Sequence, residues 1–546
     1  MKVAEAVGRA LCAAGVDQVF GVVGSGNFHV TNAMVAAGAR FVAARHEGGA
    51  ATMADAYART SGTVAVVSVH QGPGLTNAMT GIAEAAKSRT PLVVLAAEVT
   101  EPRSNFYVDQ EALARAVGAV PVRVTSAEEA VDQACVAVGL AVRERRTVLL
   151  NLPLPVQALE VPDGALAHAA PLRQRVAVEP DPDEVAALSR LLGQARRPVF
   201  VAGRGARGAG CREALEALAE QYGALLATSA VAHGLFHGDP WTLGISGGFA
   251  SPLACELIQG ADLVVGWGCA LNMWTTRHGR LIGADATVVQ VDDDPSALGA
   301  HRPVHLGVTG DVRLTARRAS EAADEPRQGY RIPQIGAALA ARVRLRDVPY
   351  EDTGTRERID PRTLSIALDD ILPAERVVGV DSGNFMGYPS AYLSVPDERG
   401  FCFTQAFQSI GLGLATTIGA ALARPDRLPV AALGDGGALM SAVELDTARR
   451  LGLPMVVVVY DDEAYGAEVH HFGPDGHPLD TVRFPPTDIA AVGRGHGFEA
   501  VTVRTPADLK AVADWVAGPR SAPLLIDAKV VADHGSWWLE EAFRGH

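Results

Sequence analysis

The last third of the chain contains two acidic motifs that could bind a metal ion together with a phosphate group. The apolar run 428–433 is followed by Gly434-Asp435-Gly436-Gly437, and a second apolar run, 455–460, is followed by Asp461-Asp462. Glycines permit a sharp turn with exposed backbone N–H groups, which bind phosphate, and carboxylates are ligands that Mg²⁺ prefers. The pattern predicts a metal-diphosphate clamp.

The segment between these motifs must bring the two acids together. Ala438 to Leu451 has apolar residues at helical spacing, Leu453-Pro454 ends that helix, and the strand Met455 to Tyr460 follows. A strand, a helix and a strand in this order place both motifs at the carboxyl edge of one parallel sheet, where ligands bind in α/β folds. Taken singly, Gly-Asp-Gly is a common turn, and an acidic pair after a strand is usually solvated.

A third acidic residue of interest, Glu47, lies near the N-terminus. It belongs to Arg45-His46-Glu47-Gly48-Gly49-Ala50, which joins the strand Phe41 to Ala44 to an alanine-rich helix, Ala51 to Arg59. A carboxylate buried at such a junction is costly unless it has a polar partner. The alternative is a charge that interacts with the helix dipole.

Polar residues also follow the strand that ends at Val69. His70 and Gln71 stand at its carboxyl end, before the glycine-rich turn that continues to Asn77. These positions suit a group that meets a ligand at the sheet edge. A lone histidine there is more often a hydrogen-bonded core residue than a catalyst.

Composition indicates a soluble, multidomain enzyme. A chain of 546 residues with 48% hydrophobic and 20% charged residues is too long for one core, and about three domains are expected. The net charge of −14, without a basic block, argues against nucleic acid or an anionic membrane as partner. Six scattered cysteines, no signal peptide and no membrane-spanning apolar run predict a cytoplasmic protein with reduced thiols.

The order of strands and helices predicts an α/β fold. Two proline-containing stretches, 162–182 and 322–358, interrupt the alternation and are interpreted as linkers. They separate three segments, 1–165, 183–325 and 355–546. Each segment is predicted to form a doubly wound domain with a mainly parallel sheet.

The middle segment contains Gly203-Arg204-Gly205 directly after an apolar strand. A nucleotide-binding turn is one interpretation. There is no complete G-x-G-x-x-G followed by a well-placed acidic residue, so a tight strand-to-helix turn is the favoured interpretation.

Taken together, these motifs resemble those of thiamine diphosphate (ThDP)-dependent enzymes, in particular the acetolactate synthase, benzoylformate decarboxylase and pyruvate decarboxylase group. The resemblance spans nearly the whole chain. It is carried by His46-Glu47-Gly48, Gly72-Pro73-Gly74 with Thr76-Asn77, Gly411-Leu412-Gly413, and Gly434-Asp435-Gly436 with the acidic pair. It implies an N-terminal pyrimidine-binding domain, a central domain and a C-terminal diphosphate-binding domain. It also implies a homodimer or homotetramer, in which the N-terminal domain of one subunit faces the C-terminal domain of another and the active sites lie at the subunit interface.

The resemblance assigns roles to individual residues. Glu47 would hydrogen-bond the aminopyrimidine and stabilise the imino tautomer that removes the thiazolium C2 proton. Ile410 would wedge the cofactor into a bent conformation, although an ordinary core isoleucine is the alternative. The remaining cofactor ligands implied are Asp435, Asp462 and the carbonyl of Ala464 for Mg²⁺, and Gly436, Gly437, Asn384 and Tyr465 for the diphosphate.

One departure from the family concerns the metal site. Members commonly have Asn-Asn where this chain has Asp461-Asp462, which adds negative charge beside the metal. Carboxylate oxygens are good ligands for hard cations, so Mg²⁺ binding should survive or tighten. Altered cofactor affinity is the other interpretation.

The implied reaction cleaves a 2-oxo acid to CO₂ and an enamine on the cofactor. The enamine then reacts with a carbonyl acceptor, as in acetolactate synthase, or takes a proton to release an aldehyde, as in benzoylformate or pyruvate decarboxylase. Ser25 and His70 match the catalytic Ser and His of benzoylformate decarboxylase, and Glu468 matches a catalytic glutamate of pyruvate decarboxylase. Gln110 falls in the place of an active-site glutamine of acetolactate synthase. His70 and Glu468 favour proton delivery, whereas the glycine-rich turn and Gln110 favour carboligation.

Other assignments remain open at the sequence level. His471 could face the substrate, or it could be a solvated loop histidine. FAD, which acetolactate synthases often bind, is not expected, because 270–280 shows no counterpart of their flavin-contacting motif. A pyruvate oxidase-like flavin enzyme is a further alternative. A non-catalytic relative is disfavoured because Glu47 and Asp435 are intact.

Overall fold

The chain forms three parallel β-sheets, one in each predicted segment, with helices packed on the faces of each sheet. The structure is a computed structural model that describes residues 1–171, 175–322, 326–532, 535–539 and 543–544. Strands such as β4 and β7 are buried along their whole length, as expected when helices cover both faces of a parallel sheet. The α/β prediction of three doubly wound domains is confirmed. The predicted ends of the second and third segments, 325 and 546, lie outside the described residues.

The eighteen strands of the described residues form three six-stranded sheets, and every strand pair is parallel. The N-terminal sheet has the order β2-β1-β3-β4-β6-β5, the central sheet β12-β11-β10-β7-β8-β9, and the C-terminal sheet β14-β13-β15-β16-β18-β17. The N-terminal strands are β1 (Gln18–Gly21), β2 (Arg40–Ala43), β3 (Ala65–Val69), β4 (Leu92–Glu98), β5 (Val120–Arg123) and β6 (Thr147–Pro153). The central strands are β7 (Pro198–Ala202), β8 (Leu225–Thr228), β9 (Thr242–Ile245), β10 (Leu263–Trp267), β11 (Thr287–Asp292) and β12 (Leu306–Thr309). The C-terminal strands are β13 (Arg376–Val380), β14 (Phe401–Phe403), β15 (Leu428–Gly434), β16 (Val456–Asp461), β17 (Glu499–Val503) and β18 (Leu524–Lys529).

Helices connect the strands in each domain. The N-terminal domain has α1 (Val3–Ala13), α2 (Phe28–Ala36), α3 (Glu47–Ser61), α4 (Pro73–Lys87), α5 (Gln110–Ala116), α6 (Ala130–Glu144) and α7 (Leu154–Gln157). The central domain has α8 (Pro182–Gln194), α9 (Cys211–Tyr222), α10 (Pro252–Gln259) and α11 (Val312–Glu321), and α12 (Pro333–Arg342) follows it. The C-terminal domain has α13 (Pro361–Ile371), α14 (Gly387–Tyr392), α15 (Gly413–Ala423), α16 (Asp435–Ser441), α17 (Glu444–Arg450), α18 (Gly466–Phe472), α19 (Ile489–Gly495) and α20 (Lys510–Ala517).

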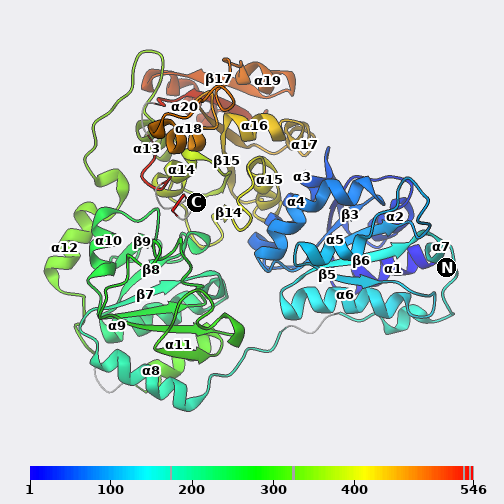
Figure 1. Cartoon of the computed structure of the whole chain (residues 1–546), viewed down its shortest axis with the longest axis horizontal. Helices are drawn as coiled ribbons and strands as arrows, with labels where there is room; N and C mark the ends of the chain where they lie inside the picture. The colour runs from blue at the N-terminus through cyan, green and yellow to red at the C-terminus, as the bar shows by residue number, and fades with distance from the viewer. Residues whose placement is uncertain (172–174, 323–325, 533–534, 540–542, 545–546) are drawn as a thin grey trace.

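The N-terminal and C-terminal domains share a hydrophobic core within one chain. Helix α3 packs against α15, and their alanine-rich faces belong to one buried cluster. A Cβ atom at Gly419 would collide with the carbonyl oxygen of Met53, so the two helix backbones approach closely there. Figure 1 shows the three domains as three lobes, with the N-terminal domain in blue to cyan, the central domain in green and the C-terminal domain in yellow to red.

Two local predictions differ from the structure. The second predicted linker, 322–358, contains the helix α12, whose Leu339 packs into the hydrophobic cluster of the central domain. The helix predicted from Ala438 begins at Asp435 and is interrupted between α16 and α17. The clamp glycines are therefore the first turn of a helix and do not form a separate loop. Among the described residues, no helix combines the length and the apolar composition needed to cross a bilayer.

Candidate active site

The predicted clamp lies at the point where the strand order of the C-terminal sheet reverses. Strands β13 and β15 are neighbours, but the chain continues from β13 to one side of the sheet and from β15 to the other. Asn384 follows β13, and Asp435 directly follows β15. In open α/β sheets such a point leaves a crevice at the carboxyl ends of the strands, where ligands bind.

Helix α16 presents its first turn to this crevice. Asp435, Gly436 and Gly437 are its first three residues, and the N–H groups of a first turn have no partner within the helix. A Cβ atom at Gly436 would lie 2.6 Å from a ring carbon of Tyr465, and one at Gly437 would collide with the carboxylate of Asp381. Only glycine leaves the backbone open at both positions, which suits close approach of a phosphate group.

Asp435 and Asp462, whose carboxylates are predicted to bind the metal, are buried near one another, and their negative charges repel. Burial, together with the charges of Asp462 and Asp461, raises the pKa of Asp435 to about 8. Burial and the charge of Asp461 raise the pKa of Asp462 to about 7. A divalent cation between Asp435 and Asp462 would relieve this repulsion, so the residues fit Mg²⁺.

The metal set that the resemblance implies has two side-chain ligands, Asp435 and Asp462, and the main-chain carbonyl of Ala464. Within the described ranges, no group of three or more His, Cys, Asp or Glu residues is arranged to hold a metal ion. Glu463, between the acids and Ala464, has a backbone φ of +59°. This left-handed conformation is unusual for a residue other than glycine. Its carboxylate is held by Arg358 at 2.6 Å.

Asp461, the first acid of the pair, has a basic partner. It is 1% exposed, and its carboxylate forms an ion pair with the buried Lys529, which also contacts Asp527 at 3.2 Å. Asp462 lines the cavity described below, whereas Asp461 does not. The two neighbouring acids therefore have separate environments.

Asp381 is a site residue that the sequence analysis missed. It follows β13 and is buried, and its carboxylate accepts hydrogen bonds from the N–H groups of Gly411, at 2.9 and 3.0 Å, and of Leu412. These bonds fix the loop that carries Ile410. Burial raises the pKa of Asp381 to about 6, and backbone N–H groups oppose the shift. An acidic residue directly after an apolar strand was the available signal.

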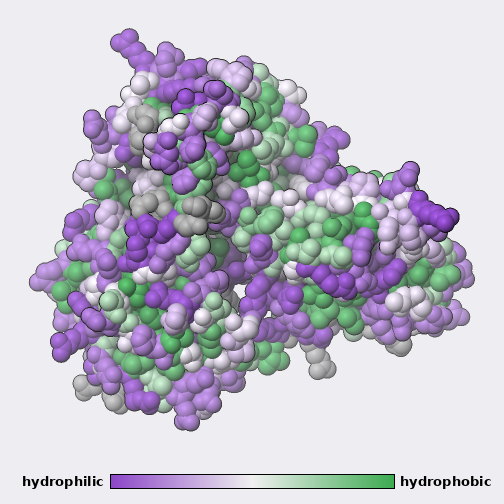
Figure 2. Space-filling view, in the orientation of Figure 1, coloured by the Kyte–Doolittle hydropathy of each residue, from purple (hydrophilic) through white to green (hydrophobic). Residues whose placement is uncertain are grey.

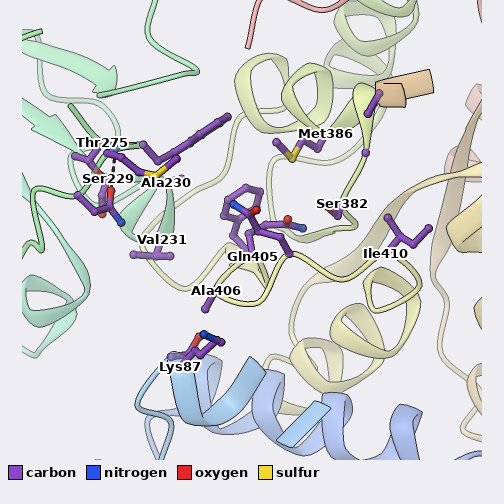
Figure 3. A pocket seen from close by; sticks show the side chains of 18 of the residues that line it. Lys87, Ser229, Ala230, Val231, Thr275, Ser382, Met386, Gln405, Ala406 and Ile410 are labelled. Atoms are coloured by element: carbon purple, nitrogen blue, oxygen red, sulfur yellow. Dashed lines mark hydrogen bonds between the residues drawn. The ribbon is translucent and has the colours of Figure 1, made fainter. Parts of the chain in front are cut away.

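A cavity of about 1130 Å³ opens beside the clamp, where the three domains meet. Figure 3 shows Lys87 entering it from α4, Ser229 to Val231 from the central domain, and Ser382, Met386 and Ile410 from the C-terminal domain. In the space-filling view, the three lobes surround a hollow (Figure 2). The cavity brings together most of the predicted C-terminal site residues: Asn384, Ile410, Asp435, Gly436, Gly437, Asp462, Ala464, Tyr465 and Glu468.

The predicted N-terminal site residues form a second group. Ser25 Oγ lies 3.3 Å from His70 Nε2, and a Cβ atom at Gly24 would collide with the His70 ring. Asn77 Nδ2 donates to the Glu47 carboxylate at 3.0 Å. Ser25 is exposed, whereas His70 and Glu47 are half-buried. Glu47 therefore has the polar partner that a carboxylate at this junction requires.

The two groups do not meet within one chain. Of the described residues that line the large cavity, none is Glu47, Ser25 or His70. Each group occupies the crevice of its own sheet, because Ser25 and His70 follow β1 and β3, which are the counterparts of β13 and β15. A single chain thus contains two half-sites with different chemistry.

Two further candidates, Gln110 and His471, do not line the large cavity. Gln110 is 2% exposed at the start of α5, and its amide donates to Asn151 Oδ1 at 2.8 Å. His471 stacks on the ring of Phe543, with centroids 4.0 Å apart, and it does not line the large cavity. Phe543 lines that cavity, so His471 contacts a residue of the cavity lining.

The glycines of the central motif are needed for backbone packing. A Cβ atom at Gly205 would lie 2.7 Å from the backbone of Gly268, and one at Gly203 would lie 2.5 Å from Cys269 Cα. Gly205 N–H also donates to the carbonyl of Gly268 at 3.0 Å. This geometry supports the interpretation as a tight turn.

Sequence comparison places the chain among known proteins. Residues 1–119 match the N-terminal TPP binding domain of thiamine pyrophosphate enzymes, residues 185–319 the central domain, and residues 381–528 the C-terminal TPP binding domain. The chain belongs to the thiamine pyrophosphate (that is, thiamine diphosphate) enzyme family, which confirms the resemblance.

Its similar relatives differ in the reaction for which they are named. The chain is 31% identical to a sulfoacetaldehyde acetyltransferase of Rhodobacter capsulatus, over 99% of this chain and 96% of the relative. It is 32% identical to the "Probable 2-ketoarginine decarboxylase AruI" of Pseudomonas aeruginosa, over 92% and 89%. It is 25% identical to the "Probable acetolactate synthase large subunit" of Methanococcus aeolicus, over 85% and 81%. The family supports ThDP-dependent chemistry on a 2-oxo acid or aldehyde.

Proposed function

We propose that this protein is a ThDP- and Mg²⁺-dependent enzyme that removes CO₂ from a 2-oxo acid and releases an aldehyde by protonation. The observation that carries the proposal is the presence of two complementary half-sites in one chain. One offers a buried acid pair and open backbone N–H groups, and the other offers Glu47 beside a Ser25–His70 pair. When bound, ThDP supplies the carbon nucleophile and the electron sink for decarboxylation.

The C-terminal half-site would hold the cofactor's charged end. Asp435, Asp462 and the carbonyl of Ala464 would bind Mg²⁺, and Gly436, Gly437, Asn384 and Tyr465 would contact the diphosphate. Ile410 would support the bent cofactor from the loop that Asp381 fixes. Glu47 would bind the pyrimidine and hold the proton that accompanies activation.

The proposal requires a second copy of the chain, because one copy separates Glu47 from Asp435. Exposed hydrophobic side chains surround both half-sites and support such an interface. They are Val23, Phe28, Phe106 and Tyr107 around the N-terminal group, and Phe407, Leu439, Met440 and Val443 around the C-terminal group. A homodimer, or a tetramer built from such dimers, would complete two sites at the subunit interface.

Proton delivery is supported by the groups around the reaction centre. His70 is positioned by two contacts, with Ser25 Oγ at Nε2 and with the carbonyl of Gln71 at Nδ1, 3.0 Å away. Glu468 lines the cavity on the opposite half-site. An imidazole and a carboxylic acid are suitable proton donors to a carbanion-like centre.

Transfer to a carbonyl acceptor is a second candidate function. It is supported by the relative named a probable acetolactate synthase large subunit. Both candidate functions use the same two half-sites, because decarboxylation precedes the choice between a proton and an acceptor. The difference lies in whether an acceptor or a proton reaches the activated carbon first.

The test is product identification after incubation of the protein with ThDP, Mg²⁺ and a panel of 2-oxo acids, with and without acceptor aldehydes. Aldehyde and CO₂ in equal amounts are expected, and coupled hydroxyketone would favour the second candidate. Absence of CO₂ from every acid, with ThDP bound, would overturn both. The six free cysteines support a reducing, cytoplasmic compartment as part of the proposal.

A further inference from the structure

The junction that carries Glu47 is held by a buried carboxylate from the other end of the chain. Glu444, the first residue of α17, is 2% exposed. Its Oε1 accepts from His46 N–H at 3.0 Å, and both of its oxygens accept from Arg45 N–H, at 3.2 and 3.3 Å. Thr447 Oγ1 donates to Oε2 at 2.6 Å and completes the set.

These contacts fix the backbone immediately before Glu47. Arg45 and His46 connect β2 to α3, and Glu47 is the first residue of that helix. A Cβ atom at Gly49 would collide with Glu444 Oε1, so the carboxylate occupies the space over the first turn of α3. A negative charge here also interacts favourably with the positive end of the helix dipole.

Other contacts of α17 with this junction are exposed and are weaker constraints. Asp446 pairs with the side chain of Arg45 at 2.5 Å, but the Arg45 side chain is 54% exposed. Exposed ion pairs contribute little to stability. Glu444 differs because it is buried and because its partners are main-chain N–H groups. Unlike the Arg45 side chain, these groups cannot rotate away from the carboxylate.

We propose that Glu444 is a positioning residue for Glu47: by accepting the N–H groups of Arg45 and His46, it sets the orientation in which Glu47 meets the cofactor's pyrimidine. This inference rests on the proposed function, because it takes Glu47 as the activating acid. Glu444 itself does not line the large cavity. Its loss would leave two partly buried N–H groups without their acceptor and would release the turn that aims Glu47.

The test compares Glu444→Leu with Glu47→Gln and with the double variant in the holoenzyme. Leucine has a similar volume but no acceptor. The measured quantity is the rate of deuterium exchange at C2 of bound ThDP, alongside ThDP affinity. Glu444→Leu is expected to slow exchange by about tenfold or more and to leave ThDP affinity within about threefold, because the diphosphate half-site is unchanged.

The double variant decides whether Glu444 acts through Glu47. If it does, Glu444→Leu adds no further loss to Glu47→Gln, since the group that it positions is already disabled. Additive losses, or a parallel fall of affinity and exchange, would overturn the proposal. Glu444→Gln retains one acceptor oxygen and is expected to fall between Glu444→Leu and the wild type. If Glu444→Leu does not fold, the same comparison is made with Glu444→Gln, Glu47→Gln and the double variant of these two.

Asp446→Asn is the matched control, because it removes the neighbouring exposed ion pair and leaves the backbone acceptor in place. Its exchange rate is expected to stay within about twofold of the wild type. Wild-type exchange no faster than that of Glu47→Gln would instead show that the proposed function has failed, independently of Glu444.

Discussion

The N-terminal and C-terminal sheets share one topology and carry opposite chemistry at the same place in it. In both sheets, the first strand of the domain lies between the second and the third: β1 lies between β2 and β3, and β13 lies between β14 and β15. The loops at this reversal hold Ser25 and His70 in the N-terminal domain, and Asp381 and Asp435 in the C-terminal domain. The fold therefore supplies equivalent crevices, and the loop residues decide what each can bind.

The packing of the two domains explains why the crevices remain separate in one chain. Helices α3 and α15 pack closely through small residues, as the contact of Gly419 with Met53 shows. This joins the domains through helices on the faces of their sheets. The N-terminal group therefore does not line the cavity that holds the C-terminal group, and this is why the proposed function invokes a second copy.

The central sheet provides a third case. Its order places β7 beside β10 at the reversal, as in dinucleotide-binding folds. There the turn at Gly203 and Gly205 packs directly against Gly268 and Cys269. Backbone occupies the space between these two turns, although the cavity shared by the three domains reaches the same turns.

The largest effect is expected from Glu47→Gln, which disables the N-terminal half-site alone. The variant keeps the size and the hydrogen bond with Asn77 but loses the ionisable group, so turnover should fall by about 10²–10⁴-fold. ThDP affinity should change little, because the diphosphate contacts lie in the other domain. Steady-state kinetics and a ThDP titration measure the two quantities. Unchanged turnover would contradict the division of labour between the half-sites.

Asp435→Asn should disable the C-terminal half-site in the complementary way. Removing one of two carboxylates from the metal set should weaken Mg²⁺ binding by about tenfold or more, and ThDP binding with it. Isothermal titration with Mg²⁺, at fixed ThDP, measures this loss. Full metal affinity in the variant would show that the acid pair is not the metal site.

The same pair predicts how stability depends on pH and metal. The raised pKa values of Asp435 (about 8) and Asp462 (about 7) mean that the folded, metal-free protein keeps protons that the unfolded chain, with carboxyl pKa values near 4, has released. This contribution to stability is fully present below about pH 4 and is lost as pH rises through about 7 to 8. Mg²⁺ should reverse the loss, because it binds the ionised pair. Thermal unfolding at pH 6 and pH 8.5, with EDTA or Mg²⁺, measures the difference, and a metal effect that is larger at pH 6 would contradict it.

His70→Ala sharpens the comparison at the N-terminal crevice, where proton delivery is expected. Aldehyde release should fall by about 10–100-fold, because a positioned acid is lost while the metal site is intact. Acceptor transfer should fall less, so the ratio of hydroxyketone to aldehyde should rise. Product analysis with an acceptor aldehyde measures this ratio. An unchanged ratio would assign the proton to another group, and Glu468→Gln is the variant for comparison.

Sequence patterns predicted the strands that carry the site better than the start of the helix that follows them. Buried strands such as β15 and β16 were predicted within one residue of their observed bounds, because continuous apolar runs followed by Gly or Asp are a strong signal. The start of α16 was placed three residues late, because glycines usually argue against a helix interior. In the structure the glycines occupy a first turn, where their missing side chains leave the N–H groups accessible.

The supporting residues could not be found in the same way. Glu444 lies on a helix with a neighbouring Asp446 and reads as part of a solvated face, yet it is buried against Arg45, almost 400 positions earlier. Such a contact depends on how the domains pack, which periodicity does not encode. The burial of Gln110 against Asn151 is likewise a tertiary result.

Asp461→Asn is expected to have the smallest effect, and it tests why this chain tolerates a third acid beside Asp435 and Asp462, the proposed metal ligands. The charge of Asp461 raises the pKa values of both Asp435 and Asp462, so the variant should shift the pH midpoint of Mg²⁺ binding downward. The shift should be less than about one unit, because Lys529 already neutralises Asp461. Stability should change by only about 1 kcal/mol, since Lys529 keeps Asp527 as a partner.

Lys529→Met is the contrasting variant. It leaves two buried acids without their cation and should lower the free energy of unfolding by about 3–5 kcal/mol. Mg²⁺ titrations across pH and denaturant unfolding measure both variants, and equal destabilisation by the two would mean that Asp461 is an essential partner of Lys529.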